Sequence, residues 1–559
     1  MSKPSALWDI SDPPPGAPSD DSLPTGPTLA GMAIALAIFY RGAELPLAPL
    51  PQLLALAVFA ELAALRPALG IVFVPLTAPL YLIPAVIPGL RAEPLRLPLH
   101  EVALLAVAAA AAARELLRRR SALRQAAAGL PARLRGELGP FARRYAPHLL
   151  LLLSGIAGVL IAVPEGRGAA LRELRWLIVE PLIFYALLRV YGAGDEARPS
   201  RSAAGGAARH LEPAVLGLIL GGVIVAALGL LQLLGLDLVP LLGEKQNFGT
   251  PNVVEADGLR RVTSVFGHPN NLGLFLGRAW PVAAALALWW LGAKGGEPGA
   301  QGREARTSGA GTSAQRDGWL LALAALVCLA GLAVSFSRGA WLGAVAAGGV
   351  LGVGMLWRGA GERGGERRPT NPRLLMLALA AAVLAIIVVG LALSLRGGVG
   401  GGSVDARVLL WREALQLIQM HPLGLGLDQF YYYHNPEFGR SIMDPALAGT
   451  SEQYASHPHN LVLDAWLNVG PLGLLALGWL VARGYRAGVE ALRRGPNPAV
   501  LGALAAMTAG LVHGLVDVFY FVEDLAIIFW MLLALVEQAR EHTPPPRPSG
   551  ASTPSRSRG

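Results

Sequence analysis

Long apolar runs separated by short polar breaks dominate the sequence. The runs are roughly 16–25 residues long, the length that a helix rising 1.5 Å per residue needs to cross about 30 Å of hydrocarbon. The strict alternation of apolar and polar residues that spanning strands need is absent from the sequence. The pattern predicts fourteen helical spans, near 28–44, 48–65, 68–89, 98–117, 146–164, 170–192, 212–235, 268–292, 318–336, 339–357, 373–395, 459–483, 498–516 and 519–540.

The first two and the last two of these runs are interrupted by polar residues or prolines, namely Arg41, Pro49, Pro51, Asp517 and Glu523. Such residues lower the predicted propensity of a run to span a bilayer. The prediction is therefore 12–14 transmembrane helices in an all-α polytopic membrane protein.

Composition supports this class, because 53% of the 559 residues are hydrophobic, 15% are charged and the mean hydropathy is +0.48. The net charge of +9 does not indicate a nucleic-acid partner, because the arginines lie between apolar runs rather than on one amphipathic face. The single cysteine, Cys328, excludes a disulfide within one chain.

The basic residues predict the orientation, because loops rich in Lys and Arg stay in the cytoplasm. The segment Arg114–Arg144 is the most basic, and alternation then places 193–211, 293–317, 358–373, 484–497 and the tail after 540 on the same side. The opposite, extracytoplasmic side receives 236–267, the turn Ser335–Arg338 and the long segment 396–458. We expect both termini in the cytoplasm of a bacterium and the protein in its inner membrane.

Candidate chemistry lies in four polar segments that this orientation places at the outer membrane boundary. The first, 260–271, carries Arg260, Arg261 and Asn270 before a span that Pro269 suits as a first-turn residue. The arginines either face an anionic group or pair with Glu255 and Asp257. The second is the turn Ser335–Trp341. Arg338 there either lines a wet cavity or sits at the interface beside a tryptophan.

The third segment, 403–430, has helical apolar spacing beside Arg407 and Arg412, and it predicts an amphipathic helix lying on the membrane as a binding element, a lid or an anchor. The fourth segment, 456–471, places Asn460, Asp464 and Asn468 four residues apart on one helical stripe. His459 at its mouth is either a structural residue or a proton acceptor near neutral pH. His513 and Asp517 are also four residues apart and could form a pair, although bundle packing is the favoured use.

Several arginines and one histidine on one face fit transfer chemistry on an anionic, lipid-attached donor. Arginine forks match phosphate oxygens, and a histidine can deprotonate an incoming hydroxyl. We predict no cofactor and no metal ion, because the sequence has no clustered acidic motif, Walker loop or dinucleotide fingerprint.

Five motifs in order then resemble the O-antigen ligase and polymerase superfamily: Arg261 with Phe266, Pro269 and Asn270; Ser337-Arg338-Gly339-Ala-Trp341; Arg407 with Trp411; Pro422, Gly424 and Gly426; and His459-Asn460 with Gly470. The resemblance covers about 210–480. The sequence departs from the ligase pattern at Trp411 and at Ser264, where leucine and glycine are common, and both departures favour a polymerase over a strict ligase.

The resemblance implies a C-type glycosyltransferase fold, an undecaprenyl-pyrophosphate-linked glycan donor and metal-independent transfer with inversion. It implies that His459 is the general base on the acceptor hydroxyl, that Arg338 and Arg261 act with it in catalysis, and that other residues bind substrate, namely Arg407, Arg260, Asn270, Asn460 and Trp411. The acceptor, whether glycan, lipid or protein, stays open. An anion or bicarbonate transporter and a membrane scaffold are the alternatives from other classes.

The predicted organisation has four parts. Residues 1–26 are a disordered cytoplasmic leader, 27–211 are N-terminal transmembrane helices with basic cytoplasmic loops, 212–540 are the ligase-like catalytic region with the extracytoplasmic loop 396–458, and 541–559 are a disordered cytoplasmic tail.

Overall fold

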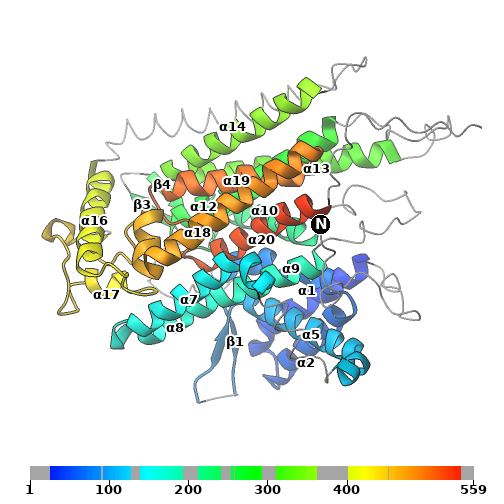
Figure 1. Ribbon diagram of the computed structural model, residues 1–559, viewed down its shortest axis with the longest axis horizontal. Helices are drawn as coiled ribbons and strands as arrows, with labels where there is room; N and C mark the ends of the chain where they lie inside the picture. The colour runs from blue at the N-terminus through cyan, green and yellow to red at the C-terminus, as the bar shows by residue number, and fades with distance from the viewer. Residues whose placement is uncertain are drawn as a thin grey trace, which may run out of the picture.

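The computed structural model describes residues 25–89, 92–126, 139–192, 212–238, 240, 253–256, 259–292, 310–361, 401–450 and 452–542. Helices make up nearly all of this structure (Figure 1). Five of the described helices are long and apolar enough to cross a membrane: α10 (Pro213–Leu233), α12 (Pro269–Gly292), Gln315–Val334 within α13 (Ala310–Val334), Arg338–Leu356 within α14 (Arg338–Gly361) and α18 (Leu461–Arg494). The protein is therefore an all-α polytopic membrane protein, as predicted.

Shorter apolar helices complete the bundle, including α2 (Leu50–Leu65), α7 (Ala146–Ile161) and α19 (Pro498–Gly514). The predicted span 373–395, residues 1–24 of the predicted leader and the tail after 542 lie outside the described residues, whereas residues 25 and 26 of that leader belong to α1 (Thr25–Arg41). The total of 12–14 spans therefore stays a prediction.

The N-terminal part packs α1 (Thr25–Arg41) against α2 and α2 against α5 (Leu99–Ala126), with the 3₁₀ turn η2 (Gly42–Glu44) after α1. The prediction of one helix over 68–89 is wrong. The chain instead forms α3 (Pro67–Ile71), α4 (Phe73–Thr77), η3 (Ala78–Leu80) and the antiparallel hairpin of β1 (Ala85–Ile87) and β2 (Leu95–Leu97). Prolines at 75, 79, 84 and 88 explain the break, because proline removes a backbone donor and clashes with the preceding turn.

The predicted span 170–192 is helical but not uniform. It follows α7 through the turn η4 (Pro164–Gly166), and it consists of α8 (Arg167–Leu174), the π-helical turn η5 (Arg175–Val179) and α9 (Glu180–Tyr191). A π-helical turn inserts one residue into the helix and shifts the faces on either side of it.

The centre of the bundle is α12, which is buried along Pro269–Leu288 except for Asn271. It packs against α10, α13, α14 and α19, and α14 packs on α19 (Figure 1). The last helix, α20 (Glu523–His542), is buried over most of its length and packs on α9, α18 and α19. It begins four residues after the start of the predicted span 519–540.

A polar assembly lies at one end of the bundle, at the left of Figure 1, where α16 (Gly401–Met420), α17 (Phe430–His434) and the hairpin of β3 (Val253–Ala256) and β4 (Leu259–Val262) gather. The turn η9 (Pro445–Leu447) belongs to the same loop. The helix α16 exposes Val408 and Leu415 of its predicted apolar face, so its place on a membrane stays a prediction. Its residues Leu410, Ala414 and Leu417 are fully buried against Leu425, Phe430, Leu447, Ala455 and Leu467.

The base of this loop, residues 424–429, is tied to the bundle by backbone contacts. The N–H groups of Leu425 and Gly426 donate to the Leu467 carbonyl at 2.8 and 3.1 Å. The Gln429 side chain accepts from Val163 and donates to the Gly166 carbonyl in the turn between α7 and α8. The helix α18 kinks at Gly470, whose φ of 68° suits glycine, and a side chain at that position would meet the Leu423 carbonyl oxygen. The loop base is therefore clamped between α7 and α18.

Candidate active site

His459 lies at the mouth of α18, with its backbone in the left-handed region at φ 51°. That conformation is unusual for a residue with a side chain and is found at functional sites. Three contacts hold it. Asn460 caps α18 by accepting from the N–H groups of Val462 and Leu463, Trp411 donates from Nε1 to the His459 carbonyl at 3.3 Å, and the His459 N–H donates to Nδ1 of His457. The predicted substrate-binding residues Asn460 and Trp411 thus position the histidine in this structure.

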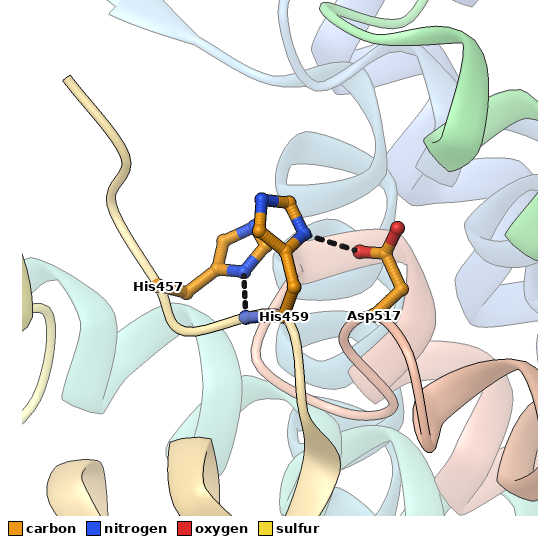
Figure 2. Close-up of side chains that lie close together, drawn as sticks. All are labelled: His457, His459 and Asp517. Atoms are coloured by element: carbon orange, nitrogen blue, oxygen red, sulfur yellow. Dashed lines mark hydrogen bonds and ion pairs between the residues drawn. The ribbon is translucent and has the colours of Figure 1, made fainter. Parts of the chain in front are cut away.

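Asp517, in the turn between α19 and α20, joins the predicted residues into one cluster. Its Oδ1 lies 3.3 Å from Nδ1 of His459 and accepts from the Val518 N–H, and its Oδ2 accepts from Nδ2 of Asn270 at 2.6 Å. Arg407 from α16 lies 4.0 Å from Oδ2. Figure 2 shows the Asp517 carboxylate facing the His459 ring, with His457 on the other side of that ring.

Arg261 from β4 enters the same cluster through Asn270, which accepts from its Nη2 at 3.0 Å, while its Nε donates to the Ser335 carbonyl at 3.1 Å. Glu255 lies opposite Arg260 in the hairpin, and the alternative that the arginines pair with Glu255 and Asp257 involves side chains outside the described part of the structure. The Arg260 side chain itself lies outside the described part of the structure.

The turn at Ser337 and Arg338 lies against α19. The Ser337 hydroxyl lies 3.3 Å from Nε2 of His513, and a side chain at Gly339 would overlap the His513 ring. His513 therefore contacts the turn, and the carboxylate of Asp517 pairs with His459 rather than with His513. Arg338 is half-buried at the first position of α14. The structure thus joins Arg261, Asn270, Arg407 and His459 through Asp517. Arg338 follows, three residues along the chain, the Ser335 whose carbonyl Arg261 contacts.

The ionisable groups of this cluster lie outside the membrane-spanning helices, and their environments shift their pKa values in different directions. Burial opposes a charge on His459, but Asp517 and Glu452 outweigh it and raise the pKa of His459 to about 9. Burial also disfavours the charge on Asp517, yet His459 holds the pKa of that carboxyl well below its usual range. Burial, aided by the charges of His459 and Arg261 respectively, lowers the pKa of His457 to about 3 and that of His268 to about 4. One histidine of the three is therefore charged at neutral pH.

His457, His459 and Asp517 are also the described residues whose side-chain atoms, all within 4.8 Å of one another, could hold a metal ion. Hydrogen bonds already use these atoms. Nδ1 of His457 accepts from the His459 backbone, Nδ1 of His459 bonds Asp517, and Arg407 brings positive charge to the same carboxylate. A histidine that carries a proton beside a carboxylate accounts for this geometry, and such a pair is able to transfer protons.

The sequence did not single out two members of the cluster. The spacing of Asp517 indicates only a partner of His513, and its remaining signal is that of an acidic residue interrupting an apolar run. Glu452, whose Oε2 lies 3.2 Å from Nε2 of His459, is one acidic residue among several in a long loop, and no spacing marks it.

The fold and this cluster define a polytopic membrane protein with an arginine, histidine and carboxylate site at one end of its helical bundle. Residues 323–478 match the family model described as O-antigen ligase, Wzy_C. This match confirms the resemblance for the motifs from Ser337 to Gly470, and the matched segment contains Arg338, Arg407 and His459. The motif of Arg261, Phe266, Pro269 and Asn270 lies outside the matched residues. No curated protein matches the chain. The family implies a glycosyltransferase-like enzyme of the membrane that acts on a lipid-linked glycan.

Proposed function

We propose that the protein transfers a glycan from an undecaprenyl-pyrophosphate-linked donor to an acceptor hydroxyl at the extracytoplasmic surface of the bacterial inner membrane. The observation that carries this proposal is the convergence of Arg261, Arg407 and His459 on Asp517. The site then contains a histidine that can accept a proton and, beside it, several arginines that carry fixed positive charge. A transfer from a pyrophosphate requires both.

In the proposed reaction, the acceptor oxygen attacks the anomeric carbon of the donor sugar as the bond from that carbon to the pyrophosphate oxygen breaks. Attack opposite the leaving group inverts the anomeric centre. His459 takes the hydroxyl proton, and Asp517 stabilises the imidazolium that forms. Arg261, Arg338 and Arg407 hold the pyrophosphate, whose charge grows as the bond breaks, and no metal ion takes part.

The raised pKa of His459 sets a condition on this mechanism. A general base must be neutral before the hydroxyl arrives, so transfer should accelerate with rising pH up to about 9 in the free enzyme. By raising the pKa of His459, Asp517 makes the histidine a stronger base, but it also lowers the fraction of His459 that is neutral at pH 7.

The test is reconstitution of the full chain in liposomes with an undecaprenyl-pyrophosphate-linked oligosaccharide. Release of undecaprenyl pyrophosphate reports transfer whichever acceptor is supplied: lipid A core, the donor's own glycan or a hydroxyl peptide. We expect His459→Ala and Arg338→Ala to lose release, and the matched control His542→Ala, at the exposed end of α20, to keep it. Undiminished transfer in both site variants would refute the proposal.

A polymerase of the same superfamily is the second candidate, favoured by Trp411 and Ser264 in the sequence. It predicts that the donor's own glycan is the best acceptor in the same assay. Uptake of bicarbonate by liposomes that release no lipid pyrophosphate would instead support the transporter.

A further inference from the structure

Both ring nitrogens of His459 are occupied by carboxylates. Nδ1 lies 3.3 Å from Oδ1 of Asp517, and Nε2 lies 3.2 Å from Oε2 of Glu452. A general base must present a ring nitrogen within about 2.6–3.2 Å of the hydroxyl that it deprotonates. One of these two contacts must therefore open when an acceptor binds.

Burial and bonding decide which contact opens. The Asp517 side chain is 2% exposed, and Asn270, the Val518 N–H and Arg407 all hold it in addition to His459. The Glu452 side chain is 23% exposed and comes from the long loop. Because the Glu452 side chain is more exposed than that of Asp517 and lies in the loop rather than in the buried turn, Glu452 is the carboxylate that an acceptor can displace, and the acceptor side of His459 is Nε2.

The motion available to Glu452 is a rotation of its side chain, because its backbone is held. Nε2 of His434 donates to the Glu452 carbonyl at 2.8 Å, and the Glu452 N–H donates to the Thr450 hydroxyl at 3.2 Å. His434 is itself fully buried and pairs through Nδ1 with Glu413 of α16 at 2.7 Å. The buried pair Glu413–His434 thus anchors Glu452 beside the catalytic histidine.

We propose that Glu452 is a positioning residue that holds the place of the acceptor hydroxyl at Nε2 of His459 and keeps His459 as an imidazolium until the acceptor displaces it. This inference rests on the proposed function, in which His459 is the general base. When the Glu452 side chain turns away, His459 loses one of its two carboxylates and gives its Nε2 proton to water. The neutral ring then accepts the hydrogen bond of the acceptor hydroxyl and takes its proton as the new glycosidic bond forms.

The charges around His459 support this assignment. Burial would raise the pKa of Glu452, but its hydrogen bond to His459 and the positive charges around it together outweigh burial and lower that pKa to about 2, so the carboxylate is charged. The titratable and charged groups that face this pair are Arg261, His268, Arg407, His457, Asp464, His513 and Asp517. Asp517 and Glu452 are the two of these that hydrogen-bond the ring.

The test needs no knowledge of the acceptor. Diethyl pyrocarbonate acylates neutral imidazole, so the rate at which it modifies His459 reports both the charge of the ring and access to it. The rate would be measured by mass spectrometry on the full chain in detergent from pH 5 to pH 10, with exposed His542 as the internal reference. The variants are Glu452→Gln, Glu452→Ala and the matched control Glu437→Gln, which removes an exposed carboxylate from the same loop.

We expect Glu452→Gln to move the midpoint for His459 by about one pH unit or more toward acid, since a neighbouring opposite charge shifts a pKa by about 1–3 units. Modification at pH 7 then rises about tenfold, since one pH unit is a factor of ten. Glu452→Ala should behave alike, and Glu437→Gln should match wild type. A loosened loop would raise the rate without moving the midpoint, so the midpoint is the criterion.

An unmoved midpoint in Glu452→Gln, or a His459 that stays unreactive at every pH in Glu452→Ala, would overturn the inference. The transfer assay separates this from failure of the proposed function. If His459→Ala transfers glycan normally, His459 is not the base and the proposed function fails. If His459→Ala is inactive while Glu452→Gln titrates as wild type, only the role of Glu452 is wrong.

Discussion

Asp517 offers the sharpest test of the proposed chemistry, through Asp517→Asn. The variant keeps the shape of the side chain but removes the charge that faces His459 and Arg407. It also creates a conflict, because in the wild-type protein Oδ2 of Asp517 accepts from Asn270 at 2.6 Å while Oδ1 accepts from the Val518 N–H. An amide has one oxygen, so one of these donors would face an NH₂ group.

The magnitude follows from the distances. Two unit charges 4 Å apart interact by about 4 kcal/mol at an effective dielectric constant of about 20. Because other charges and water share the field, a partner this close shifts a pKa by about 1–3 units, or about 1.4–4 kcal/mol. The imidazolium that forms during transfer loses this support, so the plateau of kcat/KM should fall about 10- to 1,000-fold, at 1.4 kcal/mol per factor of ten.

Asp517→Asn should lower the plateau of kcat/KM, but it should increase the fraction of neutral His459 at low pH. Asp517 raises the pKa of His459, so its removal lowers that pKa and makes the neutral base available at lower pH. The acid limb of kcat/KM for the acceptor should move toward acid by about 1–3 pH units while the plateau falls.

The assay is release of undecaprenyl pyrophosphate from liposomes between pH 5 and pH 10, with Asp405→Asn as control. Asp405 is an exposed carboxylate on α16, so its loss should leave both plateau and limb unchanged. A plateau within twofold of wild type, or a fall without any movement of the limb, would refute the reasoning that Asp517 acts through the charge of His459.

Three further predictions concern the fold and the metal. Gly470→Ala should lower the unfolding temperature in detergent because a residue forced to positive φ costs about 1–3 kcal/mol and meets the Leu423 carbonyl; Gly478→Ala on the same helix, with open space around it, should not. Glu413→Gln should leave a buried partner unsatisfied, at about 1–3 kcal/mol, and speed tryptic cleavage at Arg440 in the loop; equal cleavage rates would contradict this. Transfer should persist in EDTA, whereas loss restored by Zn²⁺ would reassign His457, His459 and Asp517 to a metal site.

Hydropathy predicted most of the helices because the bilayer imposes both the length and the apolar character of each span. It failed over 68–89, where the composition is apolar but four prolines exclude a continuous helix. The spacing in α16 predicted an amphipathic helix, but it did not show that Leu410, Ala414 and Leu417 are covered by residues of the same loop. An apolar helical face shows that something covers it and not what that cover is.

The same distinction applies to the site. Arg261, Arg407 and His459 stand in motifs, so the sequence marks them individually. The residue that joins them, Asp517, lies 58 positions after His459 and 247 after Asn270, and no local pattern encodes such contacts. Glu452 is even harder to predict from the sequence, because its role depends on a backbone held by the buried pair Glu413–His434.

The clamped base of the loop has a consequence for exchanging this loop between related proteins. Because residues 424–429 bond α18 and the turn after α7, an exchange of the whole segment between two homologous enzymes would sever backbone bonds of the membrane bundle. A chimera joined at positions 436 and 450 would keep those bonds, as well as the anchor of Glu452, and would replace only the outer part of the loop. The tolerated crossover points in this protein are therefore set by the hydrogen bonds of its loop base rather than by the ends of its helices.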